Sequence, residues 1–187
     1  MAQLRTLPPR LTPEEYLECE KIAEERHEYV DGFVHAMSGT TEAHNDIVLN
    51  LSGWLRSRLL PQGCRLFNGT VKLKTKPSDG ANYYYPDLFV SCGPRDPKGY
   101  VRHEASLVVE VLSPSTERTD RGEKFHTYTA MPSVTDFMLV SQDSVSVEVF
   151  RQKNAWQREI YAMGDVIALD AIQHALPVSE IYLDIQF

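Results

Sequence analysis

Two acidic residues of this sequence stand inside apolar runs. Asp87 follows Pro86 within residues 83–90, and Glu110 lies within the run 107–112. Burying an isolated carboxylate is costly, so each acid needs a cation, a basic side chain or backbone N–H groups beside it. The sequence leaves two interpretations open. Either Asp87 closes a turn and Glu110 pairs with an arginine, or the two acids share a functional site.

A shared site follows if the two runs form neighbouring strands joined by the polar loop 91–105. Both acids then project from one end of the sheet toward one point. Two carboxylates without a cation repel each other there, and one of them takes up a proton. Mg²⁺, with Mn²⁺ as a substitute, removes this conflict because it prefers oxygen ligands. Such a site suits the hydrolysis of phosphodiester bonds.

The first elements that must position these acids have local sequence signals. Thr12, Pro13 and Glu15 form the pattern of a capping box, which predicts a helix to about Glu25. Asp31-Gly32 predicts a tight hairpin turn between strands at 27–30 and 33–37. Apolar residues at helical spacing between about 41 and 60 predict a long helix with one buried stripe.

The rest of the chain alternates between strands and helices. Strands are predicted at 64–75, 83–90 and 106–112, and the apolar composition of the last marks it as central. Asp120 and Glu123 predict the start of a helix that runs to about Met131, with Asp120 as the N-cap. A buried strand at 137–140 follows, then a hairpin of 145–150 and 156–162, and a short terminal strand and helix. We expect one α/β domain over residues 1–187.

Four ordered segments resemble those of the Uma-two family of restriction endonucleases: residues 28–32 (EYVDG), 84–87 (YYPD), 109–116 (VEVLSPST) and 120–125 (DRGEKF). The resemblance extends from about Leu11 to beyond Phe150. It implies a restriction-endonuclease-like fold of the PD-(D/E)XK type: a mixed β-sheet flanked by helices, here with an added C-terminal β-hairpin. It also implies an acidic metal site of Glu28, Asp87 and Glu110.

The chain departs from the wider nuclease pattern at one position. The lysine expected two residues after the second acid is Leu112 here. Lys124 is the candidate to replace it, because the linker 113–119 is short enough to return the following helix toward the strand of Glu110. A lysine there would orient the attacking water or neutralise charge on the phosphate.

Other residues of chemical interest have structural alternatives. His44 precedes apolar residues at helical spacing, which indicates a hydrogen-bonded structural histidine or a contact at the mouth of the site. Lys72, Lys74 and Lys76 form either a solvated strand face or a phosphate track. The three tyrosines at 83–85 are expected to pack within the sheet rather than to stack on bases.

Composition sets outer limits on the function. The net charge of −7 argues against a protein that coats nucleic acid without specificity. Cys19, Cys64 and Cys92 are odd in number and scattered, so we expect reduced thiols. Without a membrane-spanning run or a signal peptide, a cytoplasmic location is expected. Closed homo-oligomers are common, and duplex DNA has two strands, so a two-fold dimer is predicted.

The sequence thus favours a Mg²⁺-dependent endonuclease acting on DNA. Asp87 and Glu110 are the expected catalytic metal ligands, with Glu28 as an auxiliary ligand or orienting group and Lys124 beside the phosphate. The first alternative is a non-catalytic nucleic-acid or protein binding module that retains the nuclease fold. The second is a protein in which the buried acids form structural ion pairs and the role is oligomeric assembly.

Overall fold

A six-stranded sheet forms the centre of the computed structural model, which describes residues 10–37, 39–75, 81–94 and 96–187. Its strand order is β11-β10-β9-β8-β6-β3. The strands are β3 (Arg65–Asn68), β6 (Leu88–Ser91), β8 (Leu107–Leu112), β9 (Asp136–Ser141), β10 (Val147–Arg151) and β11 (Arg158–Tyr161). Strands β8 and β9 run parallel and the other neighbours antiparallel, so the sheet is mixed.

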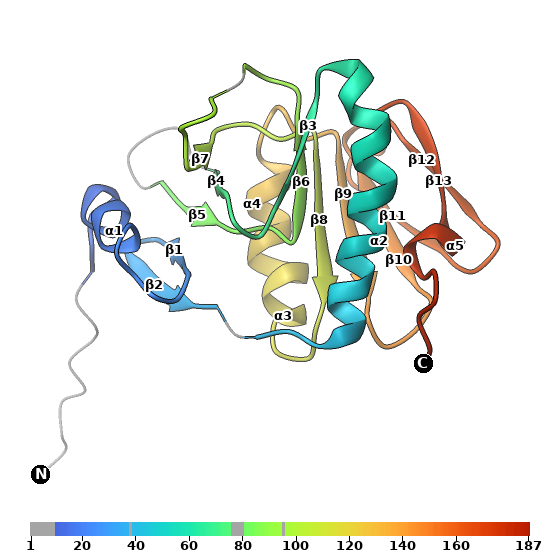
Figure 1. The fold of residues 1–187 in the computed structure, drawn as a ribbon, viewed down its shortest axis with the longest axis horizontal. Coiled ribbons are helices and arrows are strands. Elements are labelled where there is room, and N and C mark those ends of the chain that lie inside the picture. Colours follow the sequence, from blue (N-terminus) through green and yellow to red (C-terminus); the bar gives the residue numbers. More distant parts are fainter. Residues whose placement is uncertain (1–9, 38, 76–80, 95) are drawn as a thin grey trace, which may run out of the picture.

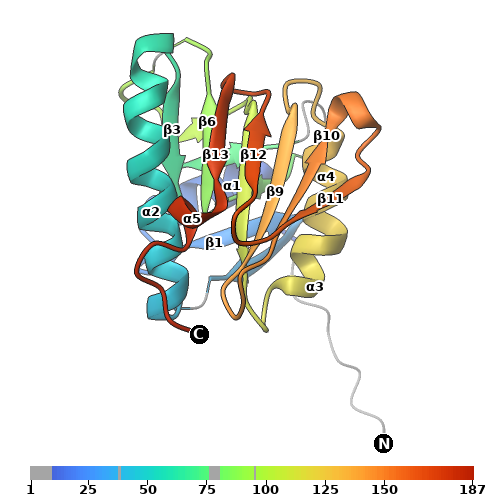
Figure 2. The ribbon, with the colours of Figure 1, turned by 90° about the vertical axis from the view of Figure 1, so that its right-hand side faces the viewer.

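Helices cover both faces of this sheet (Figures 1 and 2). One face carries α2 (Glu42–Leu59) and the short 3₁₀ turn η1 (Leu60–Gln62). The predicted buried stripe of α2 is confirmed and consists of Ile47, Leu51, Trp54, Leu55 and Leu59. The other face carries a continuous helix made of α3 (Glu117–Thr119), the π-helical turn η2 (Asp120–Lys124) and α4 (Phe125–Thr129).

The alternation of side chains along β8 assigns each of its residues to one of these faces. Val109 and Val111 belong to the core beneath α2, whereas Val108 and Leu112 belong to the core that contains Tyr128 of α4. Because neighbouring strand residues point to opposite sides, Glu110 lies on the α4 face. The predicted central position of this strand is confirmed, since all six of its residues are buried.

A second, five-stranded sheet has the order β2-β1-β5-β4-β7. Its strands are β1 (His27–Val30), β2 (Phe33–Ala36), β4 (Lys72–Lys74), β5 (Tyr83–Tyr84) and β7 (Val101–Arg102). The predicted hairpin turn is confirmed, with positive φ angles of 49° at Asp31 and 92° at Gly32. The capping box of α1 (Pro13–Glu20) is also present, although the helix ends at Glu20 rather than Glu25.

Two predicted strands are wrong in extent, because each passes from one sheet to the other. The run 64–75 divides into β3 and β4 at a turn where the N–H of Val71 bonds to the carbonyl of Asn68. The run 83–90 divides into β5 and β6 at Pro86, which has no N–H to continue a ladder. Asp87 consequently lies where the chain enters the larger sheet.

The helix predicted to start after Asp120 begins earlier, at Glu117. Asp120 is therefore a buried residue within the helix and not its N-cap. The reason is that the backbone turns immediately after Ser113, whose carbonyl accepts hydrogen bonds from the N–H groups of Thr116 and Glu117.

The C-terminal part contains the predicted hairpin, formed by β10 and β11 around the 3₁₀ turn η3 (Gln152–Asn154). A further pair of strands, β12 (Val166–Leu169) and β13 (His174–Pro177), forms its own small sheet, and α5 (Val178–Ile181) follows. The predicted fold class, a mixed sheet flanked by helices with a C-terminal hairpin, is confirmed.

The expectation of three reduced cysteines is wrong for two of them. Cys64 and Cys92 form a disulfide, and only Cys19 is free. The pairing of β3 with β6, with Arg65 opposite Ser91, places the two cysteines side by side one residue beyond the ladder. Among the described residues, no helix is both long and apolar enough to cross a membrane.

Candidate active site

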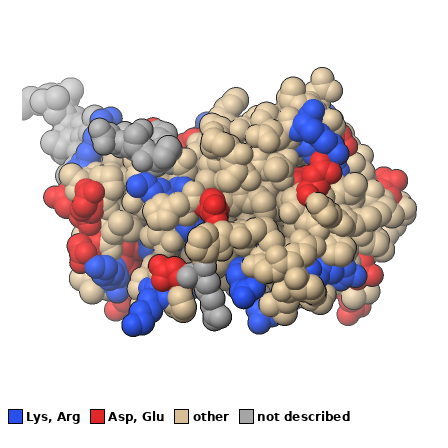
Figure 3. All heavy atoms as spheres, turned by 90° about the horizontal axis from the view of Figure 1, so that it is seen from above, with Lys and Arg blue, Asp and Glu red and all other residues tan. Residues whose placement is uncertain are grey.

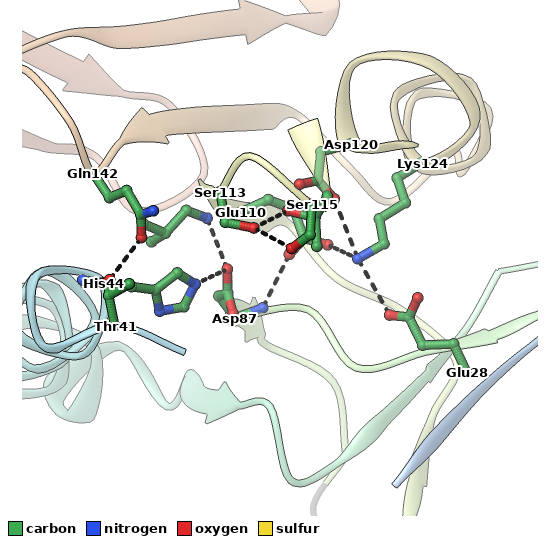
Figure 4. Close-up of polar contacts among 12 residues, drawn as sticks. Glu28, Thr41, His44, Asp87, Glu110, Ser113, Ser115, Asp120, Lys124 and Gln142 are labelled. Atoms are coloured by element: carbon green, nitrogen blue, oxygen red, sulfur yellow. Dashed lines mark hydrogen bonds and ion pairs between the residues drawn. The ribbon is translucent and has the colours of Figure 1, made fainter. Parts of the chain in front are cut away.

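Asp87 and Glu110 lie next to each other where β6 begins. Leu88 is paired with Val109, so the register continues to these two acids. The Asp87 N–H donates to Oε2 of Glu110 at 3.2 Å, and the Val111 N–H donates to Oδ2 of Asp87 at 2.7 Å. The predicted adjacency of the two strands is correct, and it brings the two carboxylates to one end of the sheet (Figure 4).

Glu110 is the more deeply buried of the two acids. Its Oε1 accepts a hydrogen bond from the Tyr128 hydroxyl at 2.9 Å and lies 3.2 Å from Nζ of Lys124. Burial raises the pKa of the Glu110 carboxyl well above its ordinary value, and the ammonium of Lys124 opposes this shift. The site thus holds a carboxylate that gains from any additional positive charge.

Lys124 stands between three carboxylates. Its Nζ lies 3.2 Å from Glu110, 3.2 Å from Glu28 and 3.3 Å from Asp120. Burial by itself lowers the pKa of this lysine, but the neighbouring carboxylates outweigh it and raise the pKa well above the ordinary value. The structure therefore places the ammonium of Lys124 beside Glu110, and the linker 113–119 returns the helix to the strand of Glu110 as predicted.

Glu28 reaches the site from β1 of the smaller sheet. Its Oε1 accepts a hydrogen bond from the Tyr85 N–H at 3.2 Å and contacts Lys124. Figure 4 shows that Nζ of Lys124 lies between Glu28 and the region of Glu110. Within the described parts of the chain, no group of three or more His, Cys, Asp or Glu side chains has an arrangement that could hold a metal ion. Asp87 and Glu110 remain a two-acid pair.

Asp120 is the member of the cluster that sequence reasoning did not identify as functional. It comes from the turn η2, and its side chain is almost completely buried. Burial raises the pKa of its carboxyl, and Lys124 opposes this shift. The spacing of four residues to Lys124 was the available signal, because side chains four apart face each other on a helix.

His44 contacts the exposed side of the acidic pair. The Thr41 hydroxyl caps α2 by accepting the His44 N–H, and Nε2 of His44 lies 3.1 Å from Oδ2 of Asp87. The Nδ1 atom is buried and has no hydrogen-bond partner among the described residues. We therefore assign a proton to Nε2, which donates to Oδ2 of Asp87, and none to Nδ1, where an N–H donor would be buried unpaired.

The remaining candidates are structural in this arrangement. Tyr83, Tyr84 and Tyr85 are buried, as predicted. Lys72 does not belong to a solvated face, because it is also buried, with Nζ 5.1 Å from the ring centre of Tyr85. Lys74 is partly buried on the same strand, and Lys76 lies outside the described residues. Lys72 and Lys74 therefore do not form an exposed phosphate track.

The comparison with protein families decides what the chain is. A family model called Uma2, described as "Putative restriction endonuclease", matches residues 13–179. The chain belongs to the Uma2 family. The four acidic and basic residues Glu28, Asp87, Glu110 and Lys124 all lie within the matched region.

Two proteins of Synechocystis match most of the chain. The uncharacterized protein slr1290 of Synechocystis is 37% identical over 183 residues, which cover 96% of this chain and 95% of the relative. A second Synechocystis protein, sll1609, also uncharacterized, is 29% identical and covers 76% of this chain and 81% of its own. The descriptions of these relatives name no activity.

A solved structure supports the fold. The crystal structure of a protein from Anabaena variabilis, described as a "putative nuclease belonging to DUF820", superposes with a TM-score of 0.75. The match covers 92% of this chain and 97% of the other, at 18% identity. At that identity the similarity establishes the shared architecture alone.

Proposed function

We propose that this Uma2 protein is a Mg²⁺-dependent endonuclease that hydrolyses phosphodiester bonds of DNA. The observation that carries the proposal is the paired carboxylates of Asp87 and Glu110 with Nζ of Lys124 3.2 Å from Glu110. Acids that hold a metal and a cation that neutralises phosphate are the parts that phosphodiester hydrolysis needs. The description of the family as a restriction endonuclease supports DNA as the substrate.

The donor set fits Mg²⁺. Both hydrogen bonds that reach the Asp87 carboxylate from described residues end on Oδ2, and the side chain is 21% exposed. Its Oδ1 is thus the oxygen suited to a ligand, together with Oε2 of Glu110. Mg²⁺ commonly uses one or two carboxylates and keeps several waters, so the two-acid pair is sufficient. When bound, the ion would supply an activated water and stabilise charge on the phosphate.

The surrounding residues have supporting roles in this proposal. The Val111 N–H and His44 fix Oδ2 of Asp87, which orients the carboxylate. Lys124 supplies positive charge next to the attacked phosphate, while Glu28 acts as an orienting group for Lys124 rather than as a direct ligand. Tyr128 donates to Glu110 and keeps one of its oxygens occupied.

One end of the molecule carries no concentrated positive charge. Figure 3 shows the end remote from α3 and from the first turn of α2, where basic and acidic side chains are interspersed around a largely uncharged centre. An interspersed surface of this kind offers DNA no concentrated positive field. We infer that DNA approaches from the side on which Asp87 and His44 are partly exposed, because solvent reaches the acidic pair there.

The direct test combines metal binding and cleavage. Calorimetric titration with Mg²⁺ or Mn²⁺ should show binding, and the purified protein should cut plasmid or single-stranded DNA only when the metal is present and not in EDTA. Metal binding without cleavage of any DNA form would refute the catalytic part of the proposal. Absence of both binding and cleavage would refute it entirely.

The second candidate is a binding module that retains the nuclease fold. It is favoured by one observation: Lys124 already provides an ammonium to three carboxylates, so the cluster has a cation without a metal. A module of this kind would retain nucleic acid or a protein in a binding assay while showing no heat of metal binding.

A further inference from the structure

We propose that Asp120 is a positioning residue that holds the ammonium of Lys124 on Glu110, and that the π-helical turn η2 exists to align them. The proposal rests on the endonuclease function proposed above. It adds an acidic residue outside the predicted metal site and assigns it a role through Lys124, not through direct contact with substrate or metal.

The burial of Asp120 supports this role. Its side chain is 2% exposed, and Oδ1 forms no hydrogen bond within the described residues although it lies 3.3 Å from Nζ of Lys124. A carboxylate with so little solvent is costly unless a charge compensates it. Lys124 is the basic residue in ion-pair contact with it, so the two charges stabilise each other.

The geometry of the helix explains how both residues reach the same point. A regular α-helix turns about 100° per residue, so residues four apart overshoot a full turn by about 40° and those eight apart by about 80°. Asp120, Lys124 and Tyr128 are spaced by four residues, so in a regular helix they would lie on one broad face but drift by about 80° from the first to the last.

The π turn removes most of this spread. Within η2 the N–H of Phe125 bonds to the carbonyl of Asp120, five residues back, so each residue advances by a smaller angle than in an α-helix. Asp120 thereby stays aligned with Lys124, and the α-helical step that follows brings Tyr128 to the same side. The contacts agree with this alignment: Lys124 and Tyr128 both contact Oε1 of Glu110, and Asp120 contacts Nζ of Lys124.

Three anchors therefore surround one ammonium. Glu28 approaches from the smaller sheet, Glu110 from the central strand and Asp120 from the helix itself (Figure 4). Of these, only Asp120 belongs to the same rigid helix as Lys124. It restrains the lysine side chain even when Glu110 is engaged by another group, which keeps the positive charge in place during the reaction.

The test replaces Asp120 by Asn, which keeps the shape and removes the charge. The readout that does not depend on cleavage is the rate at which an amine-reactive acylating reagent labels Lys124, measured by mass spectrometry. We expect labelling of Lys124 to become several-fold faster. In cleavage assays we expect kcat to fall by about ten- to a hundredfold, as for a misplaced catalytic group, with KM nearly unchanged.

The matched control is Asp170→Asn, because Asp170 pairs with Lys153 at 2.7 Å on the exposed surface. This variant should retain parental cleavage and parental labelling of Lys124. Unchanged labelling of Lys124 in folded Asp120→Asn protein would overturn the proposal. Absence of cleavage by the parent protein would instead overturn the proposed endonuclease function. The labelling rates would still test whether Asp120 holds Lys124.

A second variant keeps the proposal testable if Asp120→Asn does not fold. Asp120→Glu keeps the negative charge but adds a methylene group, which displaces the carboxylate from Nζ of Lys124. The proposal requires faster labelling of Lys124 in this variant too. A parental labelling rate in folded Asp120→Glu protein would also overturn it.

Discussion

At the scale of single residues, the state of Glu110 governs the chemistry of the site. The carboxyl is buried between the sheet and α4, and burial raises its pKa. A hydrogen bond from Tyr128 and the ammonium of Lys124 offset part of the cost of its charge. The Mg²⁺ ion that we propose for the pair of Glu110 and Asp87 would offset more of this cost.

Replacement of Asp87 separates these two interpretations. If the pair binds Mg²⁺, Asp87→Ala should abolish metal binding and metal-dependent cleavage while the fold survives, because the exposed ligand oxygen is lost. Glu110→Ala should have the same effect on cleavage. Calorimetry and a cleavage assay provide the measurement, and cleavage at the parental rate by either variant would remove that residue from the mechanism.

A substitution of Asp87 also distinguishes a structural role from a metal-binding role by its effect on the melting temperature. In a purely structural protein, Asp87→Asn should lower the melting temperature, because Val111 and His44 lose a charged acceptor. In a metal site without its ion, removal of one of two neighbouring negative charges should instead leave the melting temperature unchanged or raise it.

Lys124→Met should lower the cleavage rate by about a hundredfold or more, which is the effect expected when an electrostatic contact to the transition state is lost. Metal binding should be largely kept. An unchanged cleavage rate in this variant would exclude a catalytic role for the lysine. Calorimetry on the same sample checks the metal site.

The same variant should change how stability depends on pH. Without the ammonium, the folded-state pKa of Glu110, already raised by burial, should rise further. Above the ordinary glutamate pKa of 4.5, the unfolded chain releases this proton while the folded protein still binds it. The free energy of unfolding should therefore fall as the pH rises from 4.5 through the folded-state pKa of Glu110. Melting temperatures from pH 5 to 8 should therefore decline more steeply in Lys124→Met than in the parent protein.

At the scale of elements, the site depends on chain segments that change sheets. The chain leaves β5 and enters β6 at Pro86, and it leaves β3 and enters β4 near Gly69. This arrangement brings Glu28 of the smaller sheet, Asp87 at the crossing and Glu110 of the larger sheet into one region. The disulfide of Cys64 and Cys92 ties β3 to β6 at the opposite end of these strands.

That disulfide should stabilise the fold measurably. It closes a loop with a sequence separation of 28, for which chain entropy gives about 3–4 kcal/mol. Replacing both Cys64 and Cys92 by Ser should lower the melting temperature, and Cys19→Ser should not, because Cys19 is free and exposed. Equal melting temperatures for all three proteins would show that the bond contributes nothing to stability.

At the scale of the whole molecule, the expected two-fold dimer is open to a simple measurement. A restriction-type nuclease that cuts both strands of a duplex benefits from two sites related by symmetry. Sedimentation at micromolar concentrations should give twice the chain mass of 21.3 kDa. A single species at the mass of one chain across that range would contradict the prediction, and cleavage would then be expected to nick one strand at a time.

The features that the sequence determined by itself are those encoded by neighbouring residues. The helical spacing of apolar residues specified α2, and Asp31-Gly32 specified the first hairpin. The acids within apolar runs predicted that Asp87 and Glu110 lie side by side at one end of the sheet. Periodicity, turn chemistry and the cost of burying charge act over a few residues, so they can be read without a structure.

Only the tertiary structure decided the features that depend on distant segments. It divided the runs 64–75 and 83–90 between two sheets, paired Cys64 with Cys92, and moved Asp120 from a helix cap to the buried cluster around Lys124. Strand partners, cysteine pairs and buried ion pairs join residues far apart in the chain, and their free energies depend on which surfaces meet. The local sequence pattern does not tell which surfaces pack together, because the same side chain is exposed or buried according to what packs against it.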